Sequence, residues 1–224
     1  MHMVKRQPDW LHAYIGVSQV VNWMDAEKLT YERLLSHARE QKDEQFVARL
    51  KAIAPYPNPE TPEKSFAENC AFVRKELSRL AGETLMHHLC WDDAVKMLSL
   101  DRAISPHITL TDLSNTIIGD DAALLRPPYT SLTKDFLDID LPKDIGSSFK
   151  VPIFFFSGAH DFQTPVTLSD QWFSKIKAPH KELLHFEESS HMVFSEEPGK
   201  FLTALVNRVL PLAAAESDRK VSNG

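Results

Sequence analysis

The sequence predicts an α/β fold in which the sheet is mostly parallel. An uninterrupted apolar run at residues 151–156, Val-Pro-Ile-Phe-Phe-Phe, is typical of a strand that a parallel sheet buries on both faces. A further short apolar segment at residues 12–17 and the stretch Lys181-Glu-Leu-Leu-His-Phe186 predict additional strands. Helical patterns follow the strands at 151–156 and 181–186, so residues 151–212 are expected to form a β-α-β-α unit.

Helical patterns occupy most of the chain between the first and second predicted strands. Apolar side chains recur at steps of three and four over residues 25–53, 62–80 and 85–98, which predicts helices. Prolines at positions 55, 57, 59 and 62 separate the first two stretches, and residues 101–148 are mixed. The last predicted helix begins at Pro198, and its apolar face comprises Phe201, Leu202, Leu205, Val206, Val209 and Leu210.

The composition of the 224 residues argues against several classes of function. The 25 basic and 31 acidic residues give a net charge of −6 without long runs, which argues against a nucleic-acid partner. No stretch approaches the length of an apolar membrane span, so no membrane partner is expected. No apolar signal segment follows the N-terminal basic residues, and Cys70 and Cys90 lie in helical patterns. The expected location is therefore cytoplasmic, and nothing in the sequence predicts a cofactor.

Titratable side chains follow two of the predicted strands. Asp161 comes after the strand at 151–156, and His191 comes after the strand at 181–186, 30 residues later. Catalytic groups collect at the carboxyl ends of parallel strands, so the two side chains are candidates for one site. A carboxylate that holds an imidazole fixes its tautomer and stabilises the imidazolium, as in a catalytic triad. The alternatives are that Asp161 caps the helix expected to open at Thr164-Pro165, and that His191 is merely solvated.

The order of these motifs resembles the α/β-hydrolase family. The C-terminal part of that family is similar to Gly158-x-x-Asp161-x-x-Thr-Pro165 followed by Ser-Ser-His191 and Glu196-Glu197-Pro198-x-x-Phe201. Residues 10–22, WLHAYIGVSQVVN, precede a long charged helix and are similar to the proline iminopeptidase-like branch. The resemblance covers about residues 8–212, and it implies that Asp161 is the triad acid and His191 the triad base.

The resemblance also implies an organisation in four parts. Residues 1–22 would hold the end of the nucleophile-helix region and one core strand, and residues 23–148 the helical cap and connecting region. Residues 149–215 would form the C-terminal α/β core with the acid and the histidine, and residues 216–224 a polar tail. The expected fold is thus a partial α/β-hydrolase, a mostly parallel sheet with an inserted all-helical cap.

The chain departs from the family pattern in two places. Ser190 stands where the family usually has a glycine before the histidine. The seven glycines lie at positions 16, 82, 119, 146, 158, 199 and 224, never four apart, so the sequence contains no G-x-S-x-G nucleophile elbow. In the family, the elbow and the oxyanion-hole loop precede the strand expected at 12–17. We therefore expect the chain to lack both.

Other nucleophiles are weaker candidates. Ser18 ends the first predicted strand but lacks the second glycine of an elbow, while Ser189 and Ser190 merely adjoin His191 in sequence. Cys70 lies on the apolar face of a predicted helix, which favours a packed side chain over a thiolate.

The predicted helices also carry histidines, a cysteine and glutamates that could bind a metal ion or a substrate amine. Three side chains of one helix, at positions i, i+1 and i+3, do not converge on a tetrahedral ion, so no metal site is expected at His87, His88 and Cys90. Acidic residues of the predicted cap can either receive a substrate amine or form a solvated helix face; these are Glu27, Glu32 and Glu40.

The reaction that the resemblance implies is hydrolysis of an ester or an N-terminal peptide or amide bond through an acyl-serine intermediate. This chain would supply only Asp161 and His191. Two alternatives stay open: a non-catalytic truncated or degenerate fragment, and one half of a split hydrolase. The expected partners are a small-molecule ester or peptide substrate, together with a second copy or a complementing chain at the open edge of the strand at 12–17.

Overall fold

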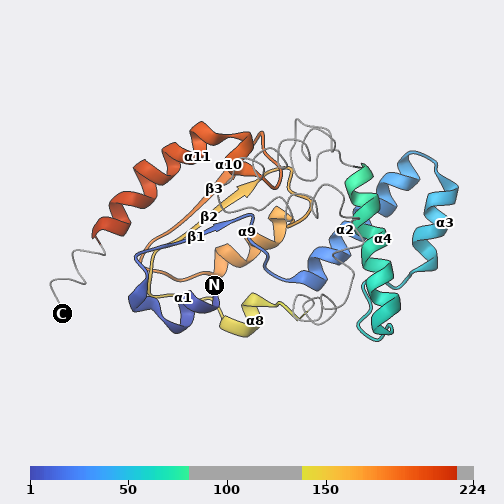
Figure 1. The fold of residues 1–224 in the computed structure, drawn as a ribbon, viewed down its shortest axis with the longest axis horizontal. Coiled ribbons are helices and arrows are strands. Elements are labelled where there is room, and N and C mark those ends of the chain that lie inside the picture. Colours follow the sequence, from blue (N-terminus) through green and yellow to red (C-terminus); the bar gives the residue numbers. More distant parts are fainter. Residues whose placement is uncertain (81–137, 216–224) are drawn as a thin grey trace, which may run out of the picture. The chain divides into compact units, whose positions relative to one another are not determined.

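The computed structural model describes residues 1–80 and 138–215 (Figure 1). The predicted helix at 85–98 and most of the mixed stretch at 101–148 lie outside the described residues, as do His87, His88 and Cys90. The described elements are α1 (His2–Arg6), the 3-10 helix η1 (Pro8–Trp10), β1 (Tyr14–Val17), α2 (Trp23–Glu40), α3 (Glu44–Ala52), α4 (Glu63–Leu80), α8 (Leu141–Ile145), β2 (Ile153–Gly158), α9 (Val166–Lys175), β3 (Lys181–Phe186), α10 (Val193–Glu196), α11 (Pro198–Ala204) and the π-helical turn η3 (Leu205–Val209).

The described residues divide into two compact units. The first contains residues 1–26 and 139–215 with the three described strands, and the second contains residues 27–80 and residue 138. Within these ranges, no helix combines the length and apolar character that a membrane crossing requires. The predicted boundaries after residues 22 and 148 stay predictions.

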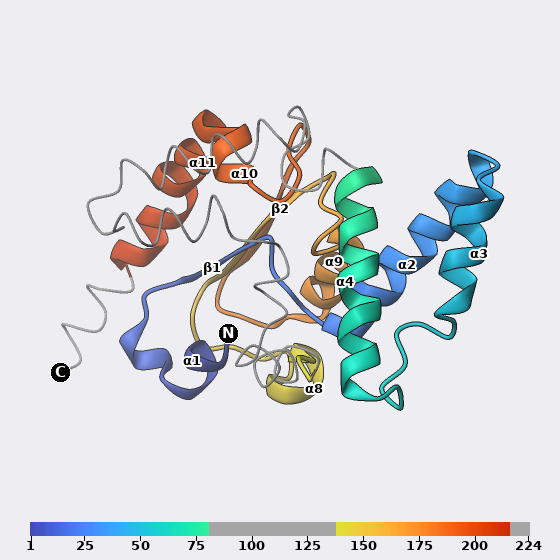
Figure 2. The ribbon, with the colours of Figure 1, turned by 45° about the vertical axis from the view of Figure 1, so that its right-hand side comes forward.

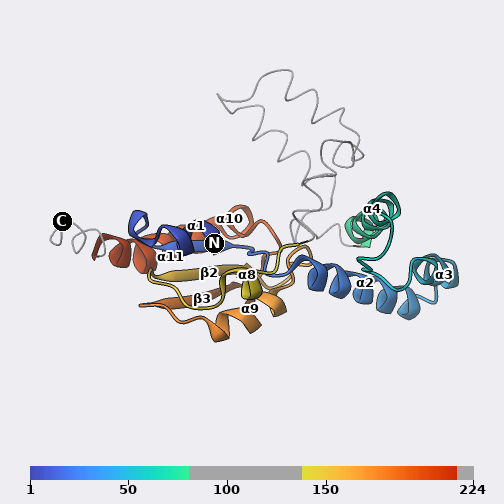
Figure 3. The same cartoon turned by 90° about the horizontal axis from the view of Figure 1, so that it is seen from below.

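The first unit is built on a parallel sheet with the strand order β1-β2-β3. Tyr14 lies opposite Ile153 and Val17 opposite Phe156, while β2 and β3 pair along their whole length and run side by side (Figure 3). All six residues of the central strand β2 are buried. The α/β class with a parallel sheet is therefore confirmed.

Alternate residues of β2 supply two cores, since neighbouring side chains of a strand point to opposite faces. Ile153 and Phe155 pack with α9 through Trp172 and Phe173. Phe154 and Phe156 pack with the C-terminal helices through residues that include Phe201 and Ala204. The helix α9 and the helices α10 and α11 accordingly lie on opposite sides of the strands (Figure 2). Each buried phenylalanine stabilises the fold by roughly 2 kcal/mol relative to an exposed one.

The second unit is helical, as the apolar periodicity predicts. A turn at residues 41–43 divides the expected 25–53 segment into α2 and α3, and Asp43 caps α3 by accepting a hydrogen bond from the Phe46 amide. Leu34, Leu50 and Val73 are each fully buried. Helix α4 matches the predicted 62–80 segment.

Two details of the predicted helices are wrong. Helix α9 begins at Val166 rather than at Thr164-Pro165, and the Thr164 hydroxyl bonds Asp161 rather than a helix amide. The expected apolar face of the last helix is only partly a core face. Three of its six residues are largely exposed: Leu202 at 61%, Val206 at 49% and Leu210 at 59%.

Candidate active site

The loop after β2 holds the Asp161 carboxylate in a fixed orientation. Asp161 is 3% exposed, and its Oδ1 accepts hydrogen bonds from the amides of Gln163 and Thr164, each at 2.9 Å. Oδ2 accepts a third hydrogen bond from the Thr164 hydroxyl at 2.6 Å. Asp161 therefore closes the turn that precedes α9 rather than capping the helix itself.

His191 follows β3 and reaches the same carboxylate. Its Nδ1 lies 2.9 Å from Asp161 Oδ2, so the expectation that the two side chains come within hydrogen-bond distance is confirmed. An ionised carboxylate only accepts hydrogen bonds, which assigns the proton to Nδ1. The His191 side chain is 26% exposed against 1% for Asp161, and Nε2 has no hydrogen-bond partner among the described residues. The geometry leaves Nε2 as the ring nitrogen that Asp161 does not occupy.

Close backbone packing brings the His191 loop to the end of β2. A Cβ built on Gly158 would lie 1.8 Å from the Ser190 carbonyl oxygen and 2.6 Å from that of Ser189, so only glycine fits there. The His160 amide also donates to the Ser189 carbonyl at 3.0 Å. Ser190, the residue that departs from the family pattern, donates its hydroxyl to the His160 carbonyl at 3.0 Å.

Two carboxylates after the loop complete its support. Glu196 accepts a hydrogen bond from the Ser190 amide at 2.7 Å, and Glu197 accepts one from the Ser189 hydroxyl at 2.7 Å. Glu197 also accepts from the Glu188 amide at 3.2 Å. The sequence contained these residues as part of a motif, yet their spacing alone did not reveal which groups they bond.

Ser18 contributes to the site differently from the nucleophile hypothesis. Its backbone has a left-handed φ of 47°, and its hydroxyl donates to the His191 carbonyl at 2.8 Å. Ser189 and Ser190 are fully buried, with their hydroxyls donated to Glu197 and to the His160 carbonyl. Within the described ranges, no serine hydroxyl donates to the His191 ring.

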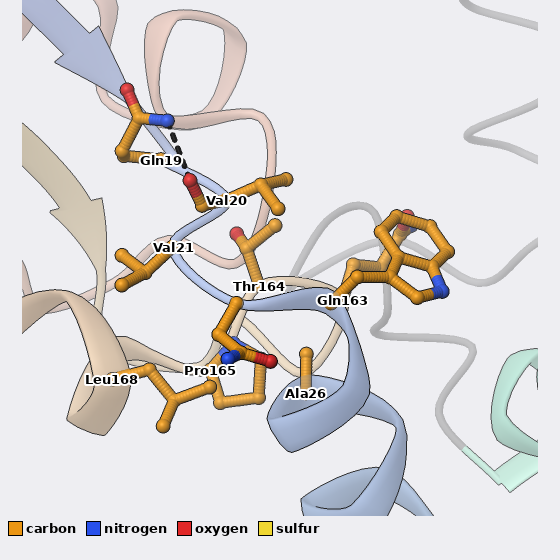
Figure 4. Close-up of a pocket in the computed structure, with 10 residues that line it drawn as sticks. Gln19, Val20, Val21, Ala26, Gln163, Thr164, Pro165 and Leu168 are labelled. Atoms are coloured by element: carbon orange, nitrogen blue, oxygen red, sulfur yellow. Dashed lines mark hydrogen bonds between the residues drawn. The ribbon is translucent and has the colours of Figure 1, made fainter. Parts of the chain in front are cut away.

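A small pocket is lined in part by Thr164, the residue whose hydroxyl bonds Asp161 (Figure 4). One wall comes from the loop after β1 and the start of α2, including Val20 and Ala26. The other wall comes from the loop after β2 and the start of α9, including Thr164, Pro165 and Leu168. Thr164 thus connects the pocket to the pair, since it lines the pocket and bonds Asp161.

The remaining candidates lie elsewhere or are committed to structure. Glu27 is fully buried and bonds Tyr56 and Arg74, while Glu32 and Glu40 are exposed. Of the three, Glu27 therefore has no free oxygen for a substrate amine. Among the residues that the structure describes, no group of three potential ligands forms a metal site.

Cys70 belongs to the same cluster as Glu27. Burial and, secondarily, the Glu27 charge raise the pKa of the Cys70 thiol to about 12. Burial also raises the pKa of Tyr56, with the Glu27 charge acting in the same direction. A thiol that stays protonated at neutral pH is a poor nucleophile, which favours the structural interpretation of Cys70.

A parallel sheet whose strand-end loops join a buried aspartate to a histidine agrees with the α/β-hydrolase core that the sequence motifs resemble. No family model matches the chain. Among curated proteins, the chain is 27% identical over 208 residues to a probable aminopeptidase, YbaC, of Bacillus subtilis strain 168. The match covers 92% of this chain and 59% of the relative, so the chain spans about three fifths of the relative's length.

Two solved structures are also similar to the chain. An alpha/beta fold family hydrolase from Bacillus anthracis str. Sterne is 20% identical, with 88% of this chain and 58% of that chain covered and a TM-score of 0.39. A proline iminopeptidase from Mycobacterium smegmatis is 17% identical, with 100% and 62% covered and a TM-score of 0.39. The curated match to a probable aminopeptidase bears out the expected resemblance to the proline iminopeptidase-like branch.

Proposed function

We propose that Asp161 and His191 are the acid and the base of a serine-hydrolase triad that cleaves an ester or an N-terminal peptide or amide bond. The observation that carries this proposal is the 2.9 Å contact between His191 Nδ1 and a carboxylate oxygen whose own orientation three further hydrogen bonds fix. The name of the curated relative, a probable aminopeptidase, favours a peptide or amide substrate. The proposed setting is the cytoplasm.

In this mechanism each residue has one task. Asp161 keeps the proton of the imidazole on Nδ1 and stabilises the imidazolium that forms during the reaction. His191 Nε2 accepts the proton of a serine hydroxyl as the serine attacks the carbonyl carbon, and then returns that proton to the leaving group. The 224 residues contain no G-x-S-x-G, so the proposed serine belongs to polypeptide outside them, joined to this chain or separate from it.

The pair is tested by the tautomer of His191 in the Asp161→Asn variant. Asp161 Oδ1 accepts from two backbone amides, so an asparagine keeps its carbonyl oxygen there and directs its NH₂ at His191 Nδ1. The NH₂ group can only donate, so Nδ1 must lose its proton and Nε2 must carry it. Imidazole ¹⁵N NMR is expected to show protonated Nδ1 in the wild type and protonated Nε2 in the variant. Identical spectra would contradict the proposed role of Asp161.

The reaction itself is tested by adding the serine. Alone, the 224-residue chain is expected to hydrolyse neither p-nitrophenyl esters nor proline anilides above the blank, and not to react with a fluorophosphonate probe. Fused behind the G-x-S-x-G segment of an aminopeptidase of this type, it is expected to hydrolyse one of these substrates. His191→Ala should then lower kcat by about 10³-fold or more. Turnover that survives His191→Ala, or labelling of the chain alone, would overturn the proposal.

A further inference from the structure

Four hydrogen-bond donors surround the Asp161 carboxylate. The amides of Gln163 and Thr164 bond Oδ1, while the Thr164 hydroxyl and His191 Nδ1 bond Oδ2. The two oxygens of an ionised carboxylate offer about four lone-pair sites, so each site here has a donor. The Asp161 side chain is 1% exposed, and solvent therefore scarcely reaches it. The position of Oδ2, the oxygen that His191 uses, depends on the one other group that bonds it, the Thr164 hydroxyl.

Thr164 contacts both oxygens of this carboxylate. Its amide donates to Oδ1 at 2.9 Å, and its hydroxyl donates to Oδ2 at 2.6 Å. The two bonds on Oδ1 come from consecutive amides, and by themselves they allow the carboxylate to turn about that oxygen. The hydroxyl opposes this turn because it fixes the second oxygen through a hydrogen bond to a charged acceptor, which is stronger than one between neutral groups.

The short distance to Oδ2 decides where the Thr164 proton lies. The hydroxyl oxygen is 2.6 Å from Asp161 Oδ2 and 3.5 Å from His191 Nδ1, so the carboxylate is by far the nearer acceptor. An ionised carboxylate has no proton to give, and Thr164 therefore donates to it. Nδ1 keeps its own proton and donates to the same oxygen. The hydroxyl and the ring thus bond Oδ2 side by side.

The local sequence restricts the conformations that are open to Thr164. A residue before proline avoids the helical backbone, and Pro165 imposes this restriction on Thr164. A β-branched side chain is also stiff about its first torsion. Helix α9 begins only at Val166, so the Thr164 hydroxyl is not drawn into a helix turn. Little conformational freedom remains to be lost when the hydroxyl bonds Asp161.

We propose that Thr164 is a positioning residue whose hydroxyl keeps Asp161 Oδ2 in line with His191 Nδ1. The inference rests on the acid and base roles proposed above for the pair, and it adds a residue that acts on His191 through Asp161. Without the hydroxyl, one of the four lone-pair sites opens next to Nδ1. The carboxylate can then turn about Oδ1, or a water molecule can enter, and either change exposes the Nδ1 proton.

A purely structural role for Thr164 makes a different prediction. The turn before α9 is already closed by the two amides that bond Oδ1, and neither of these bonds involves the Thr164 side chain. If the turn alone mattered, the loss of the hydroxyl would leave the His191 ring unaffected. The readout that separates the two roles is therefore the proton on Nδ1.

Exchange of the His191 Nδ1 proton with water, followed by ¹H–¹⁵N NMR on the full 224-residue chain, tests the proposal. Thr164→Val keeps the branched shape and removes the hydroxyl, so exchange should become about tenfold faster, as the loss of one hydrogen bond to a charged group predicts. Thr164→Ser keeps a donor and should restore the wild-type rate. Thr167→Val, the same substitution at an exposed position of α9, is the matched control and should change nothing.

The Gln163 amide reports whether the turn survives the substitution. Its exchange with water should stay slow in Thr164→Val, because its bond to Oδ1 remains. Equal Nδ1 exchange in wild type and Thr164→Val, no recovery in Thr164→Ser, or loss of protection at the Gln163 amide would each overturn the positioning role. In those cases the proposed function still stands if Asp161→Asn moves the proton to Nε2. A wild type without a proton on Nδ1 would overturn both.

Discussion

The first and second units each contain a buried carboxylate paired with a basic side chain, and the two pairs are built for different tasks. Asp161 in the first unit bonds His191, whose ring is partly exposed and can take up or release a proton. Glu27 in the second unit is fully buried, and it accepts hydrogen bonds from Arg74 and Tyr56. An arginine does not release its proton in a protein. Burial of a carboxylate therefore does not mark a site, whereas the identity and exposure of its partner do.

The largest expected effect is on the second unit. Glu27→Ala leaves the Arg74 guanidinium, itself 24% exposed, without its counter-charge. Removing one partner of such a pair should lower the free energy of unfolding by about 3–5 kcal/mol. Urea denaturation followed by circular dichroism measures the change. Glu32→Ala, on the same helix and exposed, is the matched control and should stay within about 0.5 kcal/mol.

In the first unit, the close approach at Gly158 predicts the next effect. Gly158→Ala should displace the loop that carries His191, with a loss of about 1–3 kcal/mol in the free energy of unfolding. It should also shift the NMR signals of the His191 ring. Gly199→Ala is the control, because no atom lies within 4 Å of the added Cβ. Equal stability of the two alanine variants would disprove the close packing.

Alkaline pH should weaken the second unit through Cys70. Burial raises the pKa of the Cys70 thiol from its ordinary value of 9.0 to about 12 in the folded chain, so the unfolded chain loses this proton first. Stability from this group is complete below pH 9 and declines as the pH rises toward 12, by about 1 kcal/mol between pH 9 and pH 10. Urea denaturation at both pH values measures it. Cys70→Ala should show a smaller decline; an unchanged decline would assign the effect to other groups.

Ser18 offers a pair of substitutions that separates strain from hydrogen bonding. Ser18→Ala removes the bond to the His191 carbonyl but keeps a side chain at φ 47°, so it should lose about 1 kcal/mol. Ser18→Gly removes the same bond and also relieves a left-handed strain of about 1 kcal/mol, which leaves stability nearly unchanged. Thermal denaturation of both variants checks the difference. A glycine variant less stable than the alanine variant would contradict this account.

The smallest effect is expected at an exposed pair with similar geometry. His185 Nε2 lies 3.0 Å from Asp170 Oδ1, close to the 2.9 Å of the His191–Asp161 contact, but both side chains are more than a third exposed. Asp170→Asn should change the free energy of unfolding by less than about 0.5 kcal/mol. If thermal denaturation shows a loss of unfolding free energy as large as that of the buried pairs, then the distance between the two groups, rather than their burial, would determine how much a pair stabilises the fold.

The local sequence pattern determined the class of fold and the two central residues of the site. The apolar run at residues 151–156 predicted a strand of a parallel sheet, since a strand buried on both faces lacks polar alternation, and the β-α-β-α order of residues 151–212 predicted its neighbour at 181–186. Parallel strands place their carboxyl ends at one edge of the sheet, which is why the sequence alone predicted that Asp161 and His191 lie close together. Helices α2, α3 and α4 followed from apolar periodicity for the same local reason.

Only the tertiary structure decided which groups hold those residues in place. The hydroxyl of Ser18 bonds a carbonyl 173 positions away, and Arg74 finds Glu27 across 47 positions. No periodicity encodes such contacts, because they depend on how separate elements pack. The same is true of the last helix, whose pattern predicted one apolar face although packing buries only part of it and exposes Leu202. Apolar spacing specifies a helix, whereas the neighbours available in space determine which of its side chains are covered.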